Sequence, residues 1–275
     1  MVEPEFALED SDFRKISSLV RATTGIVIDD RKRAFIHGRL GRRLRALGLQ
    51  NFSEYCRVLE GPNGAAERDV LVNAITTNHT GFFREPHHFE YLEKIVLPAI
   101  LANRTQASHR VRIWSAGCST GEEPYTLAMI VADAKLPPAW DVKILATDLD
   151  TNVVAHAKAG LYDAERAKSI PGRFRQRFAT LQPDGRTAMN DVLRSLITFK
   201  PLNLLEEWPM TGPFDMIFCR NVVIYFDKPT QRSLFNRYAE ILKPDGWLTI
   251  GHSESLQNLT DRFQLVGRTV YRRIK

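Results

Sequence analysis

A turn of small residues followed by two acids is the first segment whose composition could serve chemistry. Gly117-Cys-Ser-Thr-Gly121 follows an apolar run, and Glu122-Glu123-Pro124 opens a helical stretch. Glycines let a ligand approach the backbone because no Cβ intervenes, although many such turns only pack a helix onto a sheet. Carboxylates occupy the helix N-terminus, where a phosphate would require unoccupied N–H groups. The turn therefore favours a ligand with positive charge over a pyrophosphate.

An acid after the next apolar run adds to this pattern. Asp148 lies in Ala146-Thr-Asp148-Leu-Asp150, where doubly wound sheets place the acid that binds ribose hydroxyls. Asp150 is the better candidate for a helix cap. The glycine turn, the acid and the missing phosphate cradle suggest S-adenosylmethionine, which carries a sulfonium, an amino acid end and a ribose. A dinucleotide is the alternative, disfavoured because G-x-G-x-x-G is absent.

A sheet with helices must position these residues. After residue 105, short apolar runs alternate with helical stretches, which is typical of a mostly parallel sheet covered on both faces. Strands are expected at 111–116, 142–147, 214–219 and 247–251, and helices at 124–134, 151–158 and 229–242. Lys243-Pro-Asp-Gly246 predicts a turn by composition. Segments 263–266 and 269–274 predict a terminal antiparallel hairpin, and the polar stretch 160–197 predicts an insertion.

The first 77 residues predict a separate helical domain. We expect a helix capped by Asp10 or Ser11 and ended by Gly25, and others at 31–47, 53–60 and 65–77. The second of these, called the arginine helix here, has seven basic residues and no acid between positions 31 and 45: Arg31, Lys32, Arg33, Arg39, Arg42, Arg43 and Arg45. Its aliphatic residues recur at helical spacing, which predicts a buried stripe and a basic solvent face. That face favours an anionic partner over a merely solvated surface.

Composition excludes several classes of protein. With 275 residues, 44% hydrophobic and 25% charged, the chain can form a core. No apolar run approaches the roughly 20 residues of a membrane span, and the first residues are acidic where a signal peptide needs positive charge. Three cysteines are too few for a disulfide scaffold. We therefore expect a soluble, reduced, cytoplasmic protein.

Several segments, taken in order, resemble one known family. They are Asn78-His-Thr80-Gly-Phe-Phe-Arg84-Glu-Pro-His-His-Phe89, Ser115-Ala-Gly-Cys-Ser-Thr-Gly-Glu-Glu-Pro-Tyr125, Asn203-Leu-Leu, Phe218-Cys-Arg-Asn221-Val-Val-Ile-Tyr225-Phe226 and Gly251-His-Ser-Glu254. The chain resembles the CheR family of chemotaxis receptor protein-glutamate O-methyltransferases over nearly its whole length. The resemblance implies an α/β fold of the class I S-adenosylmethionine methyltransferase type, a Rossmann-like doubly wound sheet with an antiparallel terminal strand. It also implies a helical N-terminal domain at 1–77, a methyltransferase domain at 78–275 and an inserted β-subdomain at 160–197.

The resemblance also assigns roles to residues. Cofactor contacts, with Gly117 added from the glycine turn, would come from Asn78, Thr80, Arg84, Gly117, Glu123, Asp148, Asn203, Leu204, Arg220 and Asn221. Arg84 and Tyr225 match the pair that the family places beside the transferred methyl group. Taken alone, these two residues would be interpreted as a surface arginine and a core aromatic.

The activity implied is transfer of a methyl group from S-adenosylmethionine to glutamate side chains of chemoreceptors. The products would be glutamate methyl esters and S-adenosylhomocysteine. The cytoplasmic methylation helices of chemoreceptors are rich in Glu, so Lys32, Arg39, Arg42, Arg43 and Arg45 would dock them. The stretch 178–186 is shorter than the loop of family members that tether to a receptor C-terminal pentapeptide. We therefore expect action without that tether, by a monomer.

Two rival functions and a metal site are weaker interpretations. A nucleic-acid methyltransferase would suit the basic helix, but no Asp/Asn-Pro-Pro-Tyr/Phe motif follows the strand ending at Cys219. That cysteine lacks a preceding proline and is expected to be a buried small residue. A non-catalytic adapter that senses the cofactor is the second rival. His87 and His88 are adjacent in sequence, so we expect them to start a helix and no metal to be bound.

Overall fold

The computed structural model describes residues 5–102 and 109–275, which form two compact units. The helical unit comprises the chain up to Thr77 together with Tyr225–Asp227, and the α/β unit comprises Asn78–Ile224 and Lys228–Lys275. Each unit has its own cluster of buried apolar side chains. No helix among the described residues is long and apolar enough to cross a membrane.

Four helices build the helical unit: α1 (Asp10–Thr24), α2 (Arg33–Leu47), α3 (Phe52–Glu60) and α4 (Gly64–Ile75). A short 3₁₀ turn, η1 (Asp30–Lys32), precedes α2. Gly25 ends α1, as predicted, and Gly48 follows the predicted last residue of α2; both take the left-handed conformation, with φ of 73° and 68°. The predicted cap of α1 is wrong, because Glu9 holds the N-cap position and makes no side-chain cap bond.

The arginine helix is α2, and its aliphatic stripe is buried as predicted. Ile36, Leu40 and Leu44 are no more than 1% exposed, and they join a core with residues of α1 and α3. Leu47, at the end of the helix, is exposed. The polar face of α2 is left for the basic side chains described below.

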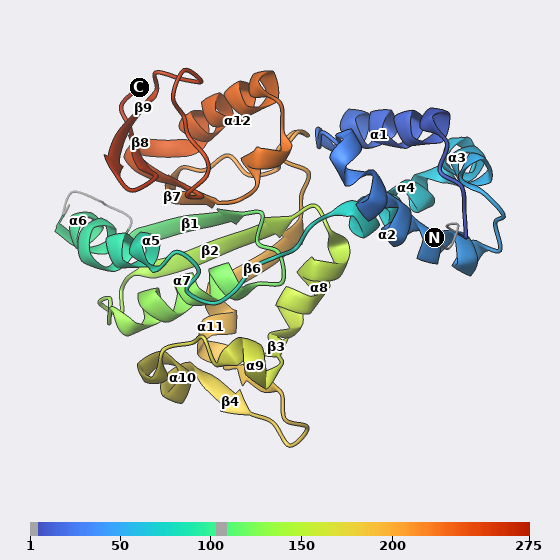
Figure 1. The fold of residues 1–275 in the computed structure, drawn as a ribbon. Helices are drawn as coiled ribbons and strands as arrows, with labels where there is room; N and C mark the ends of the chain where they lie inside the picture. Colours follow the sequence, from blue (N-terminus) through green and yellow to red (C-terminus); the bar gives the residue numbers. More distant parts are fainter. Residues whose placement is uncertain (1–4, 103–108) are drawn as a thin grey trace. The chain divides into compact units, whose positions relative to one another are not determined.

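A seven-stranded sheet forms the centre of the α/β unit (Figure 1). Its strands are β1 (Arg110–Ala116), β2 (Asp141–Asp148), β6 (Ile197–Pro201), β7 (Phe214–Cys219), β8 (Leu242–Ile250), β9 (Phe263–Gly267) and β10 (Val270–Arg273). The spatial order is β6-β2-β1-β7-β8-β10-β9. The first five are parallel, and β10 runs antiparallel to both β8 and β9. The predicted parallel sheet with a terminal hairpin is confirmed.

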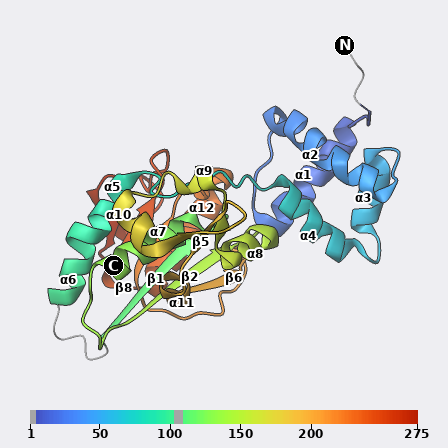
Figure 2. The ribbon, with the colours of Figure 1, turned by 90° about the horizontal axis from the view of Figure 1, so that it is seen from below.

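Helices cover this sheet. They are α5 (Pro86–Tyr91), a π-helical turn η2 (Leu92–Val96), α6 (Leu97–Ala102), α7 (Glu122–Asp133), α8 (Thr151–Ala159), a 3₁₀ turn η3 (Val223–Tyr225) and α12 (Lys228–Ile241). Contacts join α7 and α8 to β2, and α12 to β8, and Figure 2 shows α7 lying along β1 and β2. Asp150 caps α8, as predicted, by accepting from the N–H groups of Asn152 and Val153.

A small subdomain interrupts the unit between α8 and β6. Its three-stranded antiparallel sheet has the order β3 (Leu161–Tyr162), β5 (Thr187–Met189) and β4 (Ala179–Leu181). Three short helices accompany it: α9 (Ala164–Ala167), α10 (Gly172–Phe178) and α11 (Asp191–Leu196). The subdomain is drawn in yellow in Figure 1.

The predicted turn at Lys243–Gly246 is wrong. These residues belong to β8, which begins at Leu242. Asp245 takes a left-handed φ of 61°, and the pairing of β7 with β8 shifts register between Phe214 and Met216. The residues with turn-forming composition therefore form an irregularity within a continuing strand and do not reverse the chain.

Candidate active site

The carboxyl ends of the parallel strands bring most of the predicted residues to one edge of the sheet. Because β1, β2, β6 and β7 run in the same direction, the residues that follow them meet there. These residues are Gly117, Asp148, Asn203, Arg220 and Asn221.

The two glycines of the turn are required by packing. Gly117 has φ 94°, and a Cβ there would lie 2.3 Å from Cγ2 of Val222, in the loop after β7. Gly121 has φ 98°, and its Cβ would lie 2.6 Å from the Tyr162 hydroxyl oxygen. Both glycines therefore keep neighbouring segments close together. Ligand access to the backbone at these glycines, the predicted purpose, stays a prediction.

Asp148 is held at the end of β2 by backbone donors. Its carboxylate accepts from the N–H of Ser119 at 2.7 Å and from the N–H of Asp150 at 3.0 Å. Burial raises the pKa of Asp148 to about 6, although those backbone hydrogen bonds act in the other direction. The side chain remains partly exposed, so its carboxylate can accept further hydrogen bonds from a ligand hydroxyl.

Asn203 and Leu204 follow β6 beside this carboxylate. The N–H of Leu202 donates to the backbone oxygen of Asp148 at 2.9 Å, which places the next residue, Asn203, near the end of β2. The Asn203 side chain bonds locally, accepting from the N–H of Leu205 and donating to Glu206. Leu204 is buried, with 8% of its surface exposed. This segment therefore supplies an apolar side chain and a fixed turn next to Asp148.

The segment Asn78–Arg84 enters the site from before α5. Asn78 donates from its side chain to Asp150 at 2.8 Å, and its backbone oxygen accepts from the Ser119 hydroxyl at 3.1 Å. Thr80 is half-buried. One guanidinium nitrogen of Arg84 donates to the backbone oxygen of His79 at 2.7 Å. The glycine turn is thus bonded to the segment that carries three predicted cofactor residues.

Glu123 and Arg220 form a buried ion pair beneath this edge. Arg220 donates to a Glu123 carboxylate oxygen at 2.8 Å and to the backbone oxygen of Arg84 at 2.5 Å. The Ser115 hydroxyl donates to the other Glu123 oxygen at 2.7 Å. Both ionic side chains are less than a tenth exposed. The pair joins β1, α7, β7 and the segment before α5 through charge-assisted bonds.

Glu85 belongs to the same cluster, although sequence reasoning did not select it. It occupies the N-cap position of α5 with a left-handed φ of 58°. Its carboxylate lies 3.3 Å from Arg220 and 2.7 Å from Nδ1 of His252. Burial alone would raise its pKa, but the His252 hydrogen bond and the Arg220 charge outweigh burial and lower it to about 2. Its place beside Arg84 in the quoted motif was the available signal.

Two histidines start α5, as predicted, and they lie beside Glu85. Burial lowers the pKa of His88 to about 3, so its ring is neutral at physiological pH. Its Nε2 contacts the backbone oxygen of Arg268 at 3.1 Å, which fixes the ring against the β9–β10 turn. Among the described residues, Glu85, His87 and His88 place donor atoms within 4.8 Å of one another. The guanidinium of Arg220 in contact with Glu85 opposes a cation there.

Glu122 behaves differently from its neighbour Glu123. It is fully buried, and its carboxylate accepts from the Thr120 hydroxyl at 2.6 Å and pairs with Arg166 of α9 at 2.7 Å. Glu122 therefore ties the glycine turn to the inserted subdomain. Its carboxylate is satisfied within the protein, so the predicted preference for a cationic ligand depends on other groups.

Glu254 organises the loop after β7 and was also missed as a site residue. Its carboxylate accepts from the N–H groups of Asn221 (3.0 Å), Ile224 (3.3 Å) and Gly251 (2.5 Å). Burial raises its pKa above the ordinary value. Asn221 itself has a left-handed φ of 58°. A buried acid that binds three backbone donors thus fixes the conformation in which Asn221 is presented.

Comparison with known proteins identifies this arrangement. The CheR methyltransferase SAM-binding domain matches residues 78–272, and the CheR methyltransferase all-alpha domain matches residues 11–76. The chain belongs to the CheR methyltransferase family. It is 43% identical to a chemotaxis protein methyltransferase of Escherichia coli, over 96% of this chain and 91% of that one. Its identity is 44% with the Salmonella typhimurium protein (96% and 91% covered) and 42% with chemotaxis protein methyltransferase 2 of Pseudomonas aeruginosa (97% and 94% covered).

Family membership establishes the fold class and the cofactor of the α/β unit, which is called the methyltransferase unit from here on. The seven-stranded sheet is that of a class I methyltransferase, and S-adenosylmethionine is the cofactor. The donor chemistry at the sheet edge fits it. Asp148 offers carboxylate oxygens suited to hydroxyl donors such as those of a ribose.

The remaining predicted residues lie in the helical unit of this CheR chain. Lys32 places its ammonium 5.0 Å from the ring centroid of Tyr225, and Arg39 contacts the ring of Phe35. Arg43 forms two hydrogen bonds to Glu67, at 2.8 and 2.6 Å. The other docking candidates are both exposed: Arg42, and Arg45 at 3.3 Å from Glu5.

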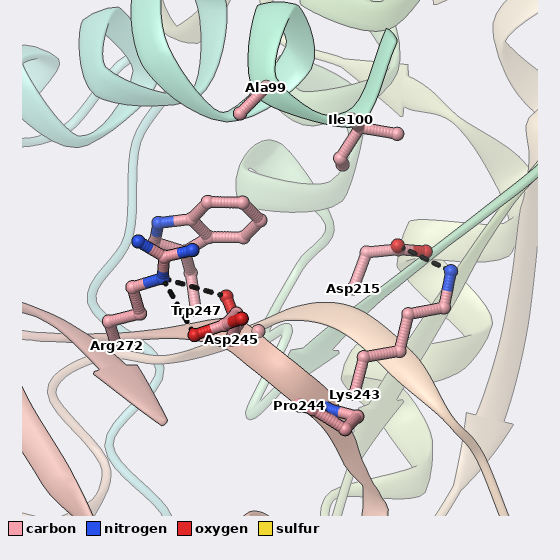
Figure 3. Close-up of a pocket in the computed structure, with 9 residues that line it drawn as sticks. Ala99, Ile100, Asp215, Lys243, Pro244, Asp245, Trp247 and Arg272 are labelled. Atoms are coloured by element: carbon pink, nitrogen blue, oxygen red, sulfur yellow. Dashed lines mark hydrogen bonds and ion pairs between the residues drawn. The ribbon is translucent and has the colours of Figure 1, made fainter. Parts of the chain in front are cut away.

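A small cavity lies at the end of the sheet opposite to the edge that carries Asp148 and Arg220 (Figure 3). It has a volume of about 140 Å³ and lies between α6 and the amino-terminal parts of β7 and β8. Its cations are paired, Lys243 with Asp215 at 2.6 Å and Arg272 with Asp245 at 3.4 Å. These ion pairs join neighbouring strands of the sheet, so we assign the cavity-lining charges a structural role.

Proposed function

We propose that this CheR protein transfers a methyl group from S-adenosylmethionine to glutamate side chains of chemoreceptors, forming glutamate methyl esters. The observation that carries the proposal is the edge at which Asp148 and the Glu123–Arg220 pair follow parallel strands. The family model that matches residues 78–272 is a SAM-binding domain, and the named relatives are chemotaxis protein methyltransferases.

The residues that would hold the cofactor divide into three groups. Asp148, with Asn203 and Leu204 next to it, would take the ribose and border the adenine. Asn78, Thr80 and Arg84 would hold the amino acid end, together with Glu123. Arg220 and Asn221 would line the floor near the sulfonium. S-adenosylmethionine supplies an electrophilic methyl group when bound. The protein supplies binding groups that are already fixed by its own hydrogen bonds.

The acceptor requires little chemistry from the chain. A glutamate carboxylate, with a reference pKa of about 4.3, is ionised at neutral pH, so no residue has to remove a proton. Opposite charges are lost as the methyl group moves, so side chains that exclude water favour the transfer. Arg84 would position the reactants, and Tyr225 would orient the carboxylate. A tight Arg84–carboxylate pair would stabilise the ground state as well and would not accelerate the reaction.

The arginine helix would dock the acceptor helix. Cations on its surface suit a Glu-rich partner and would raise the rate of encounter more than the rate of chemistry. Arg42 and Arg45 are the exposed members of this surface. Lys32, Arg39 and Arg43 also make contacts within the helical unit, and those contacts limit how far they can reach toward a partner.

Cofactor labelled in its methyl group tests the proposal. The protein is incubated with receptor-containing membranes, and separately with total RNA, and each product is treated with mild base. We expect label on the receptor band that base releases as volatile methanol, which identifies a carboxyl methyl ester. Base-stable label, label in RNA, or no label on any receptor would contradict the proposal.

A further inference from the structure

Residues 225–227 leave the methyltransferase part of the chain and pack in the helical unit. The N–H of Val27 donates to the backbone oxygen of Tyr225 at 2.9 Å. Phe226 forms an antiparallel bridge with Ile26. Arg21 of α1 pairs with Asp227 at 2.6 Å. Three consecutive residues are thus held by three different contacts, all supplied by α1 or by the segment that follows it.

The side chain of Tyr225 is held as well as its backbone. The ammonium of Lys32, in the turn η1 that leads into α2, lies 5.0 Å from the centroid of the Tyr225 ring. This distance is within the range of a cation–π contact. Among the described residues no salt bridge involves Lys32, whereas its neighbours Arg31 and Arg33 pair with Asp29 and Asp10. The ammonium of Lys32 therefore contacts the ring without a salt bridge that competes for it, although its charge also helps to lower the pKa of the nearby Asp29.

We propose that Lys32 is a positioning residue for Tyr225, and that the helical unit, which supplies this contact, helps to set the orientation of this tyrosine. The proposal rests on the role given to Tyr225 under the proposed function. It changes the role of Lys32, which the sequence grouped with the docking cations. The surface that would receive the acceptor helix and the contact that orients Tyr225 then belong to one compact unit.

The distinction between docking and positioning has a kinetic signature. Loss of a docking cation weakens encounter and raises KM at low salt. Loss of the contact on Tyr225 leaves the ring able to populate other rotamers, which lowers the fraction of complexes with the tyrosine in place and therefore kcat. Since an exposed cation–π contact is weak, we expect kcat to fall roughly two- to fivefold.

The first experiment compares Lys32→Met with Arg42→Met, which removes an equal charge from α2, and with Lys32→Arg, which keeps a cation for the ring. Initial rates on receptor membranes give kcat and KM. Lys32→Met should lower kcat, Lys32→Arg should restore it, and Arg42→Met should mainly raise KM. In a Tyr225→Leu background, Lys32→Met should have no further effect on kcat. A raised KM with unchanged kcat, or an undiminished kcat effect without the ring, would overturn the proposal.

A second measurement separates this proposal from the proposed function. The chain has seven tyrosines, and ring-labelled protein with a Tyr225→Phe reference identifies the Tyr225 resonance by NMR. Lys32→Met should shift and broaden that resonance, and Arg42→Met should not. An unchanged resonance would refute positioning even in an active enzyme. A shifted resonance in a protein that methylates no receptor would leave the positioning intact and reject the proposed acceptor. Full kcat in Tyr225→Leu would reject both roles of the pair.

Discussion

The charges beneath the sheet edge and the charges on the arginine helix differ in what surrounds them. Glu123 and Arg220 are less than a tenth exposed and are bonded to each other and to neighbouring groups. Arg42 and Arg45 lie exposed on α2. Buried pairs fix geometry and are little affected by salt, whereas exposed charges contribute little to stability but steer partners. Under the proposed function, charge would therefore serve placement in one unit and encounter in the other.

The largest expected effect comes from breaking the buried pair. Arg220→Met leaves Glu123 and Glu85 without their cation, which should cost about 3–5 kcal/mol of unfolding free energy. Urea denaturation checks this, and cofactor titration should show binding abolished or greatly weakened. Adding Glu123→Gln to this variant should recover part of the stability. A single variant as stable as the parent would show that the pair is dispensable.

Asp148 gives the next largest effect and a pH dependence. Asp148→Asn should weaken cofactor binding about 10- to 100-fold, the value of hydrogen bonds to a charged group. Because burial raises the pKa of Asp148 to about 6, its carboxylate is lost as pH falls through that value, and cofactor affinity should fall with it. Calorimetric titration between pH 5 and 7.5 measures this. An equal pH dependence in Asp148→Asn would assign it to another group.

The raised pKa of Asp148 affects folding stability in the opposite direction to cofactor affinity. The folded chain binds the Asp148 proton between the ordinary pKa of 3.8 and about 6, where the unfolded chain releases it. The contribution of this group to stability is therefore fully present below pH 3.8 and is lost as pH rises through 6.

Within α2, two neighbouring arginines sharpen the comparison. Arg43 is bidentate to the buried carboxylate of Glu67, so Arg43→Ala should cost about 1–3 kcal/mol of unfolding free energy. Arg42→Ala should leave stability unchanged and raise KM for receptors about two- to fivefold at low salt, an effect that added salt removes. Denaturation and kinetics at two salt concentrations distinguish them. Similar behaviour of both variants would contradict the division.

The smallest effect is expected at the receptor C-terminus. The strands β4 and β5 are joined by the short segment 182–186. We expect receptors that lack their last five residues to be methylated at the same rate as intact receptors. Competitive labelling of the two forms in one reaction checks this, and a clear preference for the intact form would show that the inserted subdomain binds that peptide.

Local patterns predicted the strands and helix ends well because their causes are local. Gly25 and Gly48 end helices through their own φ angles, and Asp150 caps α8 through its own carboxylate. Glu85 and Glu254 escaped selection because their partners are distant in sequence or are backbone N–H groups. An acid with such partners has the same sequence appearance as a surface acid.

The turn prediction at Lys243–Gly246 failed for a related reason. Proline and glycine favour a turn through the local backbone conformations that they adopt. Pairing with β7 decides whether the chain reverses there or continues as a strand. The sequence could not separate the roles of the adjacent glutamates Glu122 and Glu123 either. Their partners, Arg166 and Arg220, come from different parts of the chain.

The bridge between Ile26 and Phe226 also has a consequence for biosynthesis. Domains generally fold as they leave the ribosome, at about 5–20 residues per second. The four helices of the first unit are complete at Ile75, but its last three residues are made only after β7. Synthesis of the residues between Ile75 and Tyr225 therefore takes several seconds or more, during which the helical unit lacks these three residues. A fragment that stops at Thr77 would keep the arginine helix and lack the tyrosine, so under the proposed docking role it would be a receptor-binding decoy without being an enzyme.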